Sequence, residues 1–223
     1  MSRILIPSAG PESWKRFLAD EGHWKSGYSA KSLAYCWEDT DSIPSEVESI
    51  LQTAPPFVGS ELLLAIPEHT VPLPGGSRAS QTDLWLLLRT PAARASVALQ
   101  GKVKETFGPT VAEWSKNSST GKRVRLQALQ DLLALPGIPG EIRYQLLHRT
   151  ASAILQARRF LAAHAVILVH SFSQSDDWFD DFAAFSKLLG ASATKGKLTQ
   201  APAYQQPTLH LGWVRGDPQF LTR

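Results

Sequence analysis

An unbroken apolar run late in the chain, AVILVHSF at residues 165–172, places the strongest constraint on the fold. Its length suits a strand and is short for a helix. A strand that is apolar on both faces has to be covered on both faces, as happens in the middle of a sheet flanked by helices. We therefore expect a layered α/β fold in which this segment is an interior strand.

The segments around this run follow an order that predicts an α/β protein with a mixed central sheet. Residues 61–73 are short apolar stretches broken by prolines, which is typical of a kinked or bulged edge strand. TDLWLLLRT (82–90) and ASVALQGKVKE (95–105) predict an antiparallel hairpin. The remaining predicted elements are helices within residues 11–52, helices at about 122–135 and 141–162, an acidic aromatic helix at 176–189, and a last strand at 208–214.

The composition, with 43% hydrophobic and 19% charged residues, is that of a globular chain, and we expect one domain over residues 1–223. No apolar run approaches the roughly 20 residues that cross a bilayer, so we expect no membrane span. The start, MSRILIPSAG, lacks the apolar core of a secretory signal, which favours a cytoplasmic protein. The single cysteine, Cys36, excludes an internal disulfide and a zinc site made of cysteines, and we expect it to be a small buried side chain.

Positive charge is concentrated in the middle of the chain. Residues 102–159 contain 10 Lys and Arg against 4 Asp and Glu, although the net charge of the whole chain is only +3. Such a segment either forms a basic surface that attracts a polyanion or consists of solvated helix faces covered by long cationic side chains. The distribution by itself leaves both interpretations open.

Three polar residues on the predicted hairpin form the strongest candidate site. Gln100 and Lys102 are two residues apart on one strand, so their side chains leave the same face of the sheet. Asp83 opens the neighbouring strand, and pairing of the two strands brings an acid, an amide and an amine together. A lysine flanked by apolar strand positions has to be at an edge, paired or functional.

These residues, together with Tyr144 and Gln145 on the following helix and the strand at 165–172, resemble the PD-(D/E)XK nuclease superfamily. The common core of that superfamily runs helix, three strands, helix, strand. Its signature is an Asp followed, after a variable gap, by Glu or Asp, any residue, and Lys. The resemblance covers roughly residues 42–172. It makes residues 1–41 an N-terminal helical extension and residues 173–223 a C-terminal helix and strand extension of one restriction endonuclease-like domain.

The resemblance implies a role for each residue of the candidate site. Asp83 would be the bridging ligand of a Mg²⁺ or Mn²⁺ ion, with Gln100 bound through its side-chain oxygen and Gly101 through its backbone carbonyl. Lys102 would orient the attacking water or offset charge in the transition state. Gln145 corresponds to the helix-borne glutamine that positions the metal or a phosphate in that superfamily.

Two positions depart from the signature of the superfamily. Thr82 precedes Asp83 where Pro is usual, and Gln100 stands where Glu or Asp is usual. An amide oxygen can coordinate Mg²⁺ but brings no charge, so the metal would be held more weakly. Glu105, or an acid of the preceding helices such as Glu48, could supply the missing charge.

Three interpretations of function follow. The first is a metal-dependent endonuclease that hydrolyses phosphodiester bonds of DNA in restriction, repair or defence. Its partner would be nucleic acid, and it could assemble as a homodimer. The second keeps the fold but not the catalysis, as a pseudo-nuclease that binds nucleic acid or protein. In the third, the resemblance is accidental and the protein is structural or an unrelated hydrolase.

Two stretches, PSAGPESW and RYQLLHRTASAIL, also resemble an uncharacterised bacterial domain family.

The helix at 141–162 carries a polar stripe at Gln145, Arg149, Ser152 and Gln156. This stripe either lines a groove beside the site strands or forms an exposed helix face. His148 and His170 have no partner at ligand spacing in the sequence, so we expect each of them to be a structural or surface group.

Overall fold

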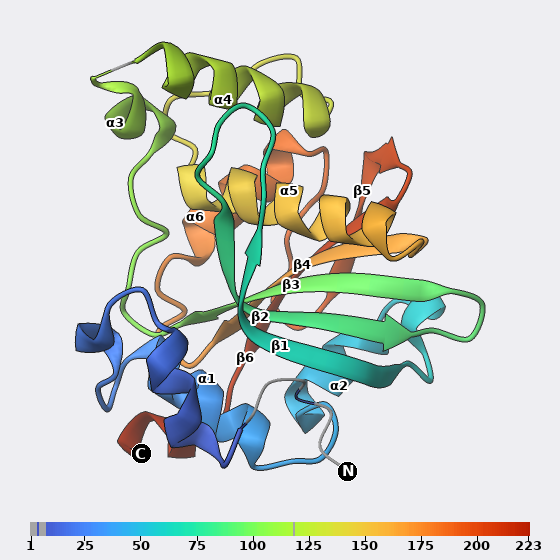
Figure 1. The fold of residues 1–223 in the computed structure, drawn as a ribbon. Helices are drawn as coiled ribbons and strands as arrows, with labels where there is room; N and C mark the ends of the chain where they lie inside the picture. The colour runs from blue at the N-terminus through green and yellow to red at the C-terminus, as the bar shows by residue number, and fades with distance from the viewer. Residues whose placement is uncertain (1–3, 5–7, 118) are drawn as a thin grey trace.

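The computed structural model describes residue 4, residues 8–117 and residues 119–223. Most of the first seven residues, on which the expectation about a secretory signal depends, lie outside this description. The described chain forms a six-stranded mixed sheet in the order β1-β2-β3-β4-β6-β5, with helices on both of its faces (Figure 1). The predicted α/β class with a mixed, flanked sheet is therefore confirmed.

The first three strands form an antiparallel meander, and the sheet then continues with parallel pairs. β3 pairs in parallel with β4, β4 pairs in parallel with β6, and β5 lies antiparallel to β6 at the far edge. The strands are β1 (Glu61–Val71), β2 (Ser80–Arg89), β3 (Arg94–Lys102), β4 (His164–Ser171), β5 (Leu198–Gln205) and β6 (Thr208–Arg215).

The helices divide between the two faces of the sheet (Figure 1). The α-helices are α1 (Ser29–Glu38), α2 (Ser45–Leu51), α3 (Val111–Ser115), α4 (Thr120–Leu132), α5 (Tyr144–Arg159) and α6 (Phe179–Leu188). Short 3-10 helices are η1 (Pro11–Phe17), η2 (Glu21–His23), η3 (Pro55–Phe57) and η4 (Pro218–Thr222). Buried side chains of α1 and α2 belong to one apolar core, and those of α4, α5 and α6 belong to the other. None of the described helices is long and apolar enough to cross a membrane.

The alternation of side chains along β4 explains why two cores form. Ala165, Ile167 and Val169 face the core beneath α5, whereas Val166 and Leu168 face the core beneath α1 and α2. All five side chains are fully buried, with 0% exposure. The expected interior strand is thus confirmed, because its apolar residues on both faces are covered by helices.

The predicted hairpin and edge strand are confirmed as well. β2 and β3 are antiparallel, and β1 lies at one edge of the sheet with a register shift between Leu62 and Leu64. The sequence did not indicate β5 or α3. LTQAPAYQ is polar and contains a proline, which a strand tolerates at a sheet edge, and α3 is a single short turn of helix.

The loop between β1 and β2 rises to meet α4 (Figure 1), and Gly75 is the residue that permits this contact. Its φ is +81°, and a Cβ atom there would lie 2.7 Å from the Cα of Arg125 and 2.8 Å from the carbonyl oxygen of Val124. The clashing atoms belong to the backbone of α4, which cannot move aside as a flexible side chain could. Glycine is therefore required both by the positive φ angle and by the lack of space for a Cβ atom.

We expect Gly75→Ala to destabilise the protein more than Gly59→Ala, measured by urea unfolding. Gly59 also has a positive φ, of +75°, but a Cβ atom there meets nothing within 4 Å. Both variants should lose about 1–2 kcal/mol from backbone strain, and Gly75→Ala should lose a further 1–3 kcal/mol or so from overpacking against α4. Equal losses would show that the loop moves away from α4 at no cost.

Candidate functional site

Asp83 and the Gln100-Gly101-Lys102 segment lie beside each other on neighbouring strands. Leu84 of β2 pairs with Leu99 of β3, and continuation of this register sets Asp83 opposite Gln100. The backbone N–H of Gly101 donates a hydrogen bond to Asp83 Oδ2 over 3.1 Å. The sequence-predicted residues of the hairpin are therefore brought together at one end of β2 and β3.

Lys102 is buried on the face of the sheet that α5 covers. The residue is only 5% exposed. Its Nζ donates to Gln145 Oε1 at 3.3 Å and to the carbonyl oxygen of Thr106 at 3.4 Å. The ammonium group also lies 4.8 Å from the ring centroid of Phe107. Burial lowers the pKa of Lys102 from its ordinary value, while the negative charge of Asp83 opposes that shift.

Gln145 joins the site from the first turn of α5, as the resemblance implied. Its contact with Lys102 connects the helix to the strand residues. Gly101 contributes its N–H group to Asp83, and its Cα faces away from this site. A Cβ atom there would lie 3.3 Å from Ser29 Cβ, on α1, so the close packing of α1 accounts for a glycine at this position.

Arg149, one turn further along α5, pairs with Asp83. The guanidinium Nη2 lies 3.4 Å from Asp83 Oδ1, and the residue is only 7% exposed. Burial lowers the pKa of Arg149, and the charges of Asp83 and Glu68 oppose that shift. The sequence placed Arg149 in a polar stripe of α5 but did not indicate this ion pair.

The polar stripe of α5 faces the sheet and is not an exposed helix face. Ser152 is fully buried, and Gln156 is 2% exposed with its Nε2 lying 2.9 Å from His69 Nε2. His148 is also structural, because its Nδ1 lies 2.8 Å from Ser80 Oγ and burial lowers its pKa well below the ordinary histidine value. The stripe therefore forms a polar layer between α5 and the strands.

Glu68 is a site residue that the sequence analysis missed. β1 pairs with β2 through Pro67 with Leu84 and through His69 with Thr82, so the register sets Glu68 opposite Asp83. Burial, and then the negative charge of Asp83, raise the pKa of Glu68 well above its ordinary value, and Arg149 opposes that shift. The sequence did contain a signal for Glu68, because an acid within a mostly apolar strand segment needs a partner when it is buried.

Neither of the two acids that the sequence offered for the missing charge lies opposite Asp83 in the strand register, although the charge of Glu105 acts on Lys102. Glu48 is exposed on α2, which covers the opposite face of the sheet. Glu105 is engaged elsewhere, since its carboxylate accepts the backbone N–H of Ser29 at 2.7 Å and that of Val103 at 2.9 Å. It thereby stabilises the start of α1. Glu68 is the acid that the strand register sets opposite Asp83.

Gln100 is the least satisfied polar residue of the site. It is 0% exposed, and neither its Oε1 nor its Nε2 has a hydrogen-bond partner among the described residues. A buried amide without partners costs about 1–3 kcal/mol. The backbone register sets Glu68, Asp83 and Gln100 at neighbouring positions of β1, β2 and β3, and Glu68 Oε2 accepts a hydrogen bond from Gln81 Nε2 at 2.9 Å.

A family comparison places the whole fold in one known group. The model of a family described as a domain of unknown function (DUF6946) matches residues 7–218. The chain belongs to this family. It matches no curated protein and no solved structure. Because the DUF6946 description names no activity, the function has to be argued from the geometry of the site.

The raised pKa of Glu68 predicts a loss of stability as the pH rises. A folded state that holds a proton which the unfolded chain has lost becomes less stable with increasing pH. The loss of stability begins near pH 4.5, the ordinary pKa of a glutamate, and continues up to the pKa of Glu68 in the folded protein, which is about 8. We expect the free energy of unfolding to fall by about 1.4 kcal/mol for each unit of pKa shift.

Glu68→Gln carries no charge at any pH and should remove this loss, as measured by urea unfolding at several pH values. The matched control is Glu141→Gln, because Glu141 is exposed in the segment before α5. It should keep the wild-type pH dependence. A Glu68→Gln variant with the same pH dependence as the wild type would show that Glu68 is not the titrating group.

Proposed function

We propose that this protein is a divalent-metal-dependent phosphodiesterase that cleaves DNA. One observation carries the proposal: Glu68, Asp83 and Gln100 form a row across three strands, beside the buried amine of Lys102. Two carboxylates and an amide oxygen can hold a hard cation, and an amine beside them can act on a phosphate or its attacking water.

The order of elements supports a PD-(D/E)XK type of enzyme. α2, the meander β1-β2-β3, α5 and β4 follow one another in the sequence helix, three strands, helix, strand. α2 and α5 cover opposite faces of the sheet, and β4 continues it beside β3. The resemblance inferred from short motifs thus agrees with the arrangement of elements around them.

The proposed division of labour follows from the chemistry of each side chain. Asp83, Glu68 and Gln100 would hold the ion, which would polarise a phosphate and lower the pKa of water. Lys102, whose own pKa is lowered by burial, is suited to exchange a proton with water or to offset negative charge on the phosphate. Gln145 is a positioning residue, because it accepts a hydrogen bond from Lys102 Nζ.

Glu68 resolves the problem posed by Gln100. The signature of the superfamily expects a carboxylate at position 100, and the amide there removes one negative charge. A cation bound beside Glu68 would favour the ionised form of this acid, which would return that charge from the edge strand β1. The site then keeps two carboxylates, which is sufficient to hold Mg²⁺ together with water and phosphate oxygens.

Exposed cations near the site favour DNA as the substrate. Lys104 lies two residues after β3, Lys116 is the exposed residue that caps the end of α3, and Arg123 is exposed on α4, which lies over α5 (Figure 1). Arg125, which the sequence analysis counted with them, is only 6% exposed and donates to the carbonyl oxygen of Arg78 at 2.8 Å. The exposed basic residues of this segment are therefore fewer than the sequence indicates.

A second candidate function is a nucleic-acid-binding module without catalysis. The ion pair between Arg149 and Asp83 favours it, because a guanidinium group already neutralises the carboxylate that a metal ion would need. In such a protein the buried charges would maintain the fold, and only the exposed cations would contact phosphates.

Cleavage of plasmid, linear and single-stranded DNA in Mg²⁺ or Mn²⁺ tests the proposal. We expect the wild type to cleave at least one substrate. Asp83→Asn and Lys102→Met should each lower the rate by at least about 100-fold, the loss typical of a group that acts on the transition state. Gln100→Glu should increase metal affinity, since it adds a charge at nearly constant volume. Glu141→Gln is the matched control and should cleave like the wild type.

DNA binding without cleavage, by the wild type and by Gln100→Glu, would overturn the catalytic proposal and support the binding module. Binding should then weaken with salt, with a log–log slope of roughly −0.9 for each phosphate neutralised. Neither cleavage nor binding would contradict both functions. Cleavage that persists undiminished in Asp83→Asn would move the active site away from this row.

A further inference from the structure

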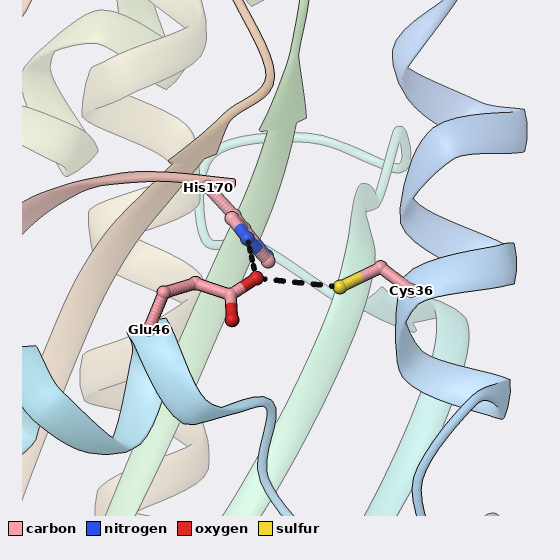
Figure 2. A group of neighbouring side chains, drawn as sticks. All are labelled: Cys36, Glu46 and His170. Atoms are coloured by element: carbon pink, nitrogen blue, oxygen red, sulfur yellow. Dashed lines mark hydrogen bonds and ion pairs between the residues drawn. The ribbon is translucent and has the colours of Figure 1, made fainter. Parts of the chain in front are cut away.

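A second cluster of reactive side chains lies on the opposite face of the sheet. Cys36 of α1, Glu46 of α2 and His170 of β4 turn toward one another (Figure 2). Glu46 Oε1 lies 3.1 Å from His170 Nε2 and 3.5 Å from Cys36 Sγ. All three potential ligand atoms lie within 4.8 Å of one another. The three residues come from separate parts of the chain and converge only in the fold.

His170 has no partner at ligand spacing in the sequence, yet the fold brings Glu46 and Cys36 close to it. Its partners are more than a hundred residues away in the sequence, so no local spacing could reveal them. His170 is fully buried, and Nε2 is the ring nitrogen that points at Glu46 (Figure 2). Cys36 is buried as expected, with 3% exposure in the apolar core beneath α1 and α2, and its thiol donates to Glu46 Oε1.

The order of the contacts does not fit a nucleophilic cysteine. In a catalytic cysteine and histidine pair, the imidazole contacts the thiol and takes its proton. Here Glu46 lies between the other two residues and accepts from both (Figure 2). Burial, together with the negative charge of Glu46, also raises the pKa of the Cys36 thiol far above its ordinary value, which disfavours a reactive thiolate.

The distances instead suit three ligands around one ion. With Zn–S near 2.3 Å and Zn–N and Zn–O near 2.0 Å, tetrahedral ligands lie roughly 3.3–3.6 Å from each other. The two contacts of Glu46, at 3.1 and 3.5 Å, fall close to this range, and the ligand atoms of Cys36 and His170 lie within 4.8 Å of each other, so a small side-chain movement would complete the set. A thiolate, an imidazole and a carboxylate are each common zinc ligands, whereas Mg²⁺ prefers oxygen ligands alone.

The open side of the cluster faces an acidic cavity. A cavity of about 310 Å³ is lined by Cys36 and Glu46 and by three further acids, Asp39, Glu48 and Asp217. No Lys or Arg is among its described lining residues. Glu46 reaches the solvent, since its side chain is 22% exposed. The cavity therefore offers a cation an entry path with a favourable charge, and it leaves one side of the ion open.

We propose that Cys36, Glu46 and His170 form a binding site for a Zn²⁺ ion, with a fourth position open to the acidic cavity. Three protein ligands and an open position are typical of zinc sites that hold a water or a substrate. The acids around the opening repel phosphates, so a molecule entering this cavity would be neutral or cationic. The site is separate from the Asp83 row, because the sheet lies between them.

Titration of the purified full-length chain with Zn²⁺ and Co²⁺ tests this site. We expect one Zn²⁺ ion to bind per chain and to displace bound Co²⁺. Because Cys36 is the only cysteine of the chain, a thiolate-to-cobalt charge-transfer band can come from no other residue. Zn²⁺ should also raise the thermal unfolding midpoint, since it would connect α1, α2 and β4.

Paired variants separate the site from a general acidic surface. Glu46→Gln and Cys36→Ser should weaken Zn²⁺ binding by at least about 100-fold, which exceeds the loss expected from an outer-sphere partner. Glu48→Gln, on the same helix and in the same cavity, should bind like the wild type. Asp83→Asn should also retain binding. Circular dichroism of each variant confirms that it is folded.

Three results would overturn the zinc site. These are absence of Zn²⁺ binding at micromolar concentration, a bound Co²⁺ spectrum without the thiolate band, and equal weakening by Glu48→Gln and Glu46→Gln. None of these results bears on DNA cleavage, which depends on the other face of the sheet. Loss of Zn²⁺ binding in Asp83→Asn would assign the ion to the Asp83 row and would equally contradict the site at Cys36.

Discussion

Burial of charge between the sheet and α5 is the constraint on which the rest of this structure depends. Glu68, Asp83, Lys102 and Arg149 lie in one layer, and an isolated buried charge costs several kcal/mol. Arg149 forms an ion pair with Asp83, and the raised pKa of Glu68 favours its neutral form. Apolar side chains of similar volume would stabilise such a layer at least as well. These four ionisable groups therefore do not owe their place to stability alone, and the proposed metal site would give them a chemical role.

The sheet separates two sites of different character. α5 covers one face and carries Gln145 and Arg149 to the strand ends, where oxygen donors and an amine converge. α1 and α2 cover the other face, where sulfur, nitrogen and oxygen ligands converge beside an acidic cavity. β4 and its neighbour β3 connect the two, because alternate side chains of a strand point to opposite faces. A hard cation suits the first site, and zinc suits the second.

Local pattern was sufficient for the parts of the fold that depend on local sequence. The run at 165–172 predicted an interior strand, and the i, i+2 spacing of Gln100 and Lys102 predicted a shared face. Glu68 and the partners of His170 were beyond such reasoning, because strand register and helix packing bring them together over long separations. The ion pair of Arg149 was missed for the same reason. Sequence reasoning offered Glu48 and Glu105 for the missing charge, but α2 carries Glu48 on the other face of the sheet and Glu105 accepts the N–H of Ser29 at the start of α1.

Binding of Mn²⁺ to the Asp83 row tests the central claim most directly. Electron paramagnetic resonance measures the concentration of free Mn²⁺. The decrease of this signal when protein is added gives the number of Mn²⁺ ions that each chain binds. We predict one site in the wild type that Asp83→Asn abolishes, Gln100→Glu strengthens and Glu46→Gln leaves intact. Identical Mn²⁺ binding by the wild type and Asp83→Asn would contradict the account, because the row across β1, β2 and β3 would then not be a metal site.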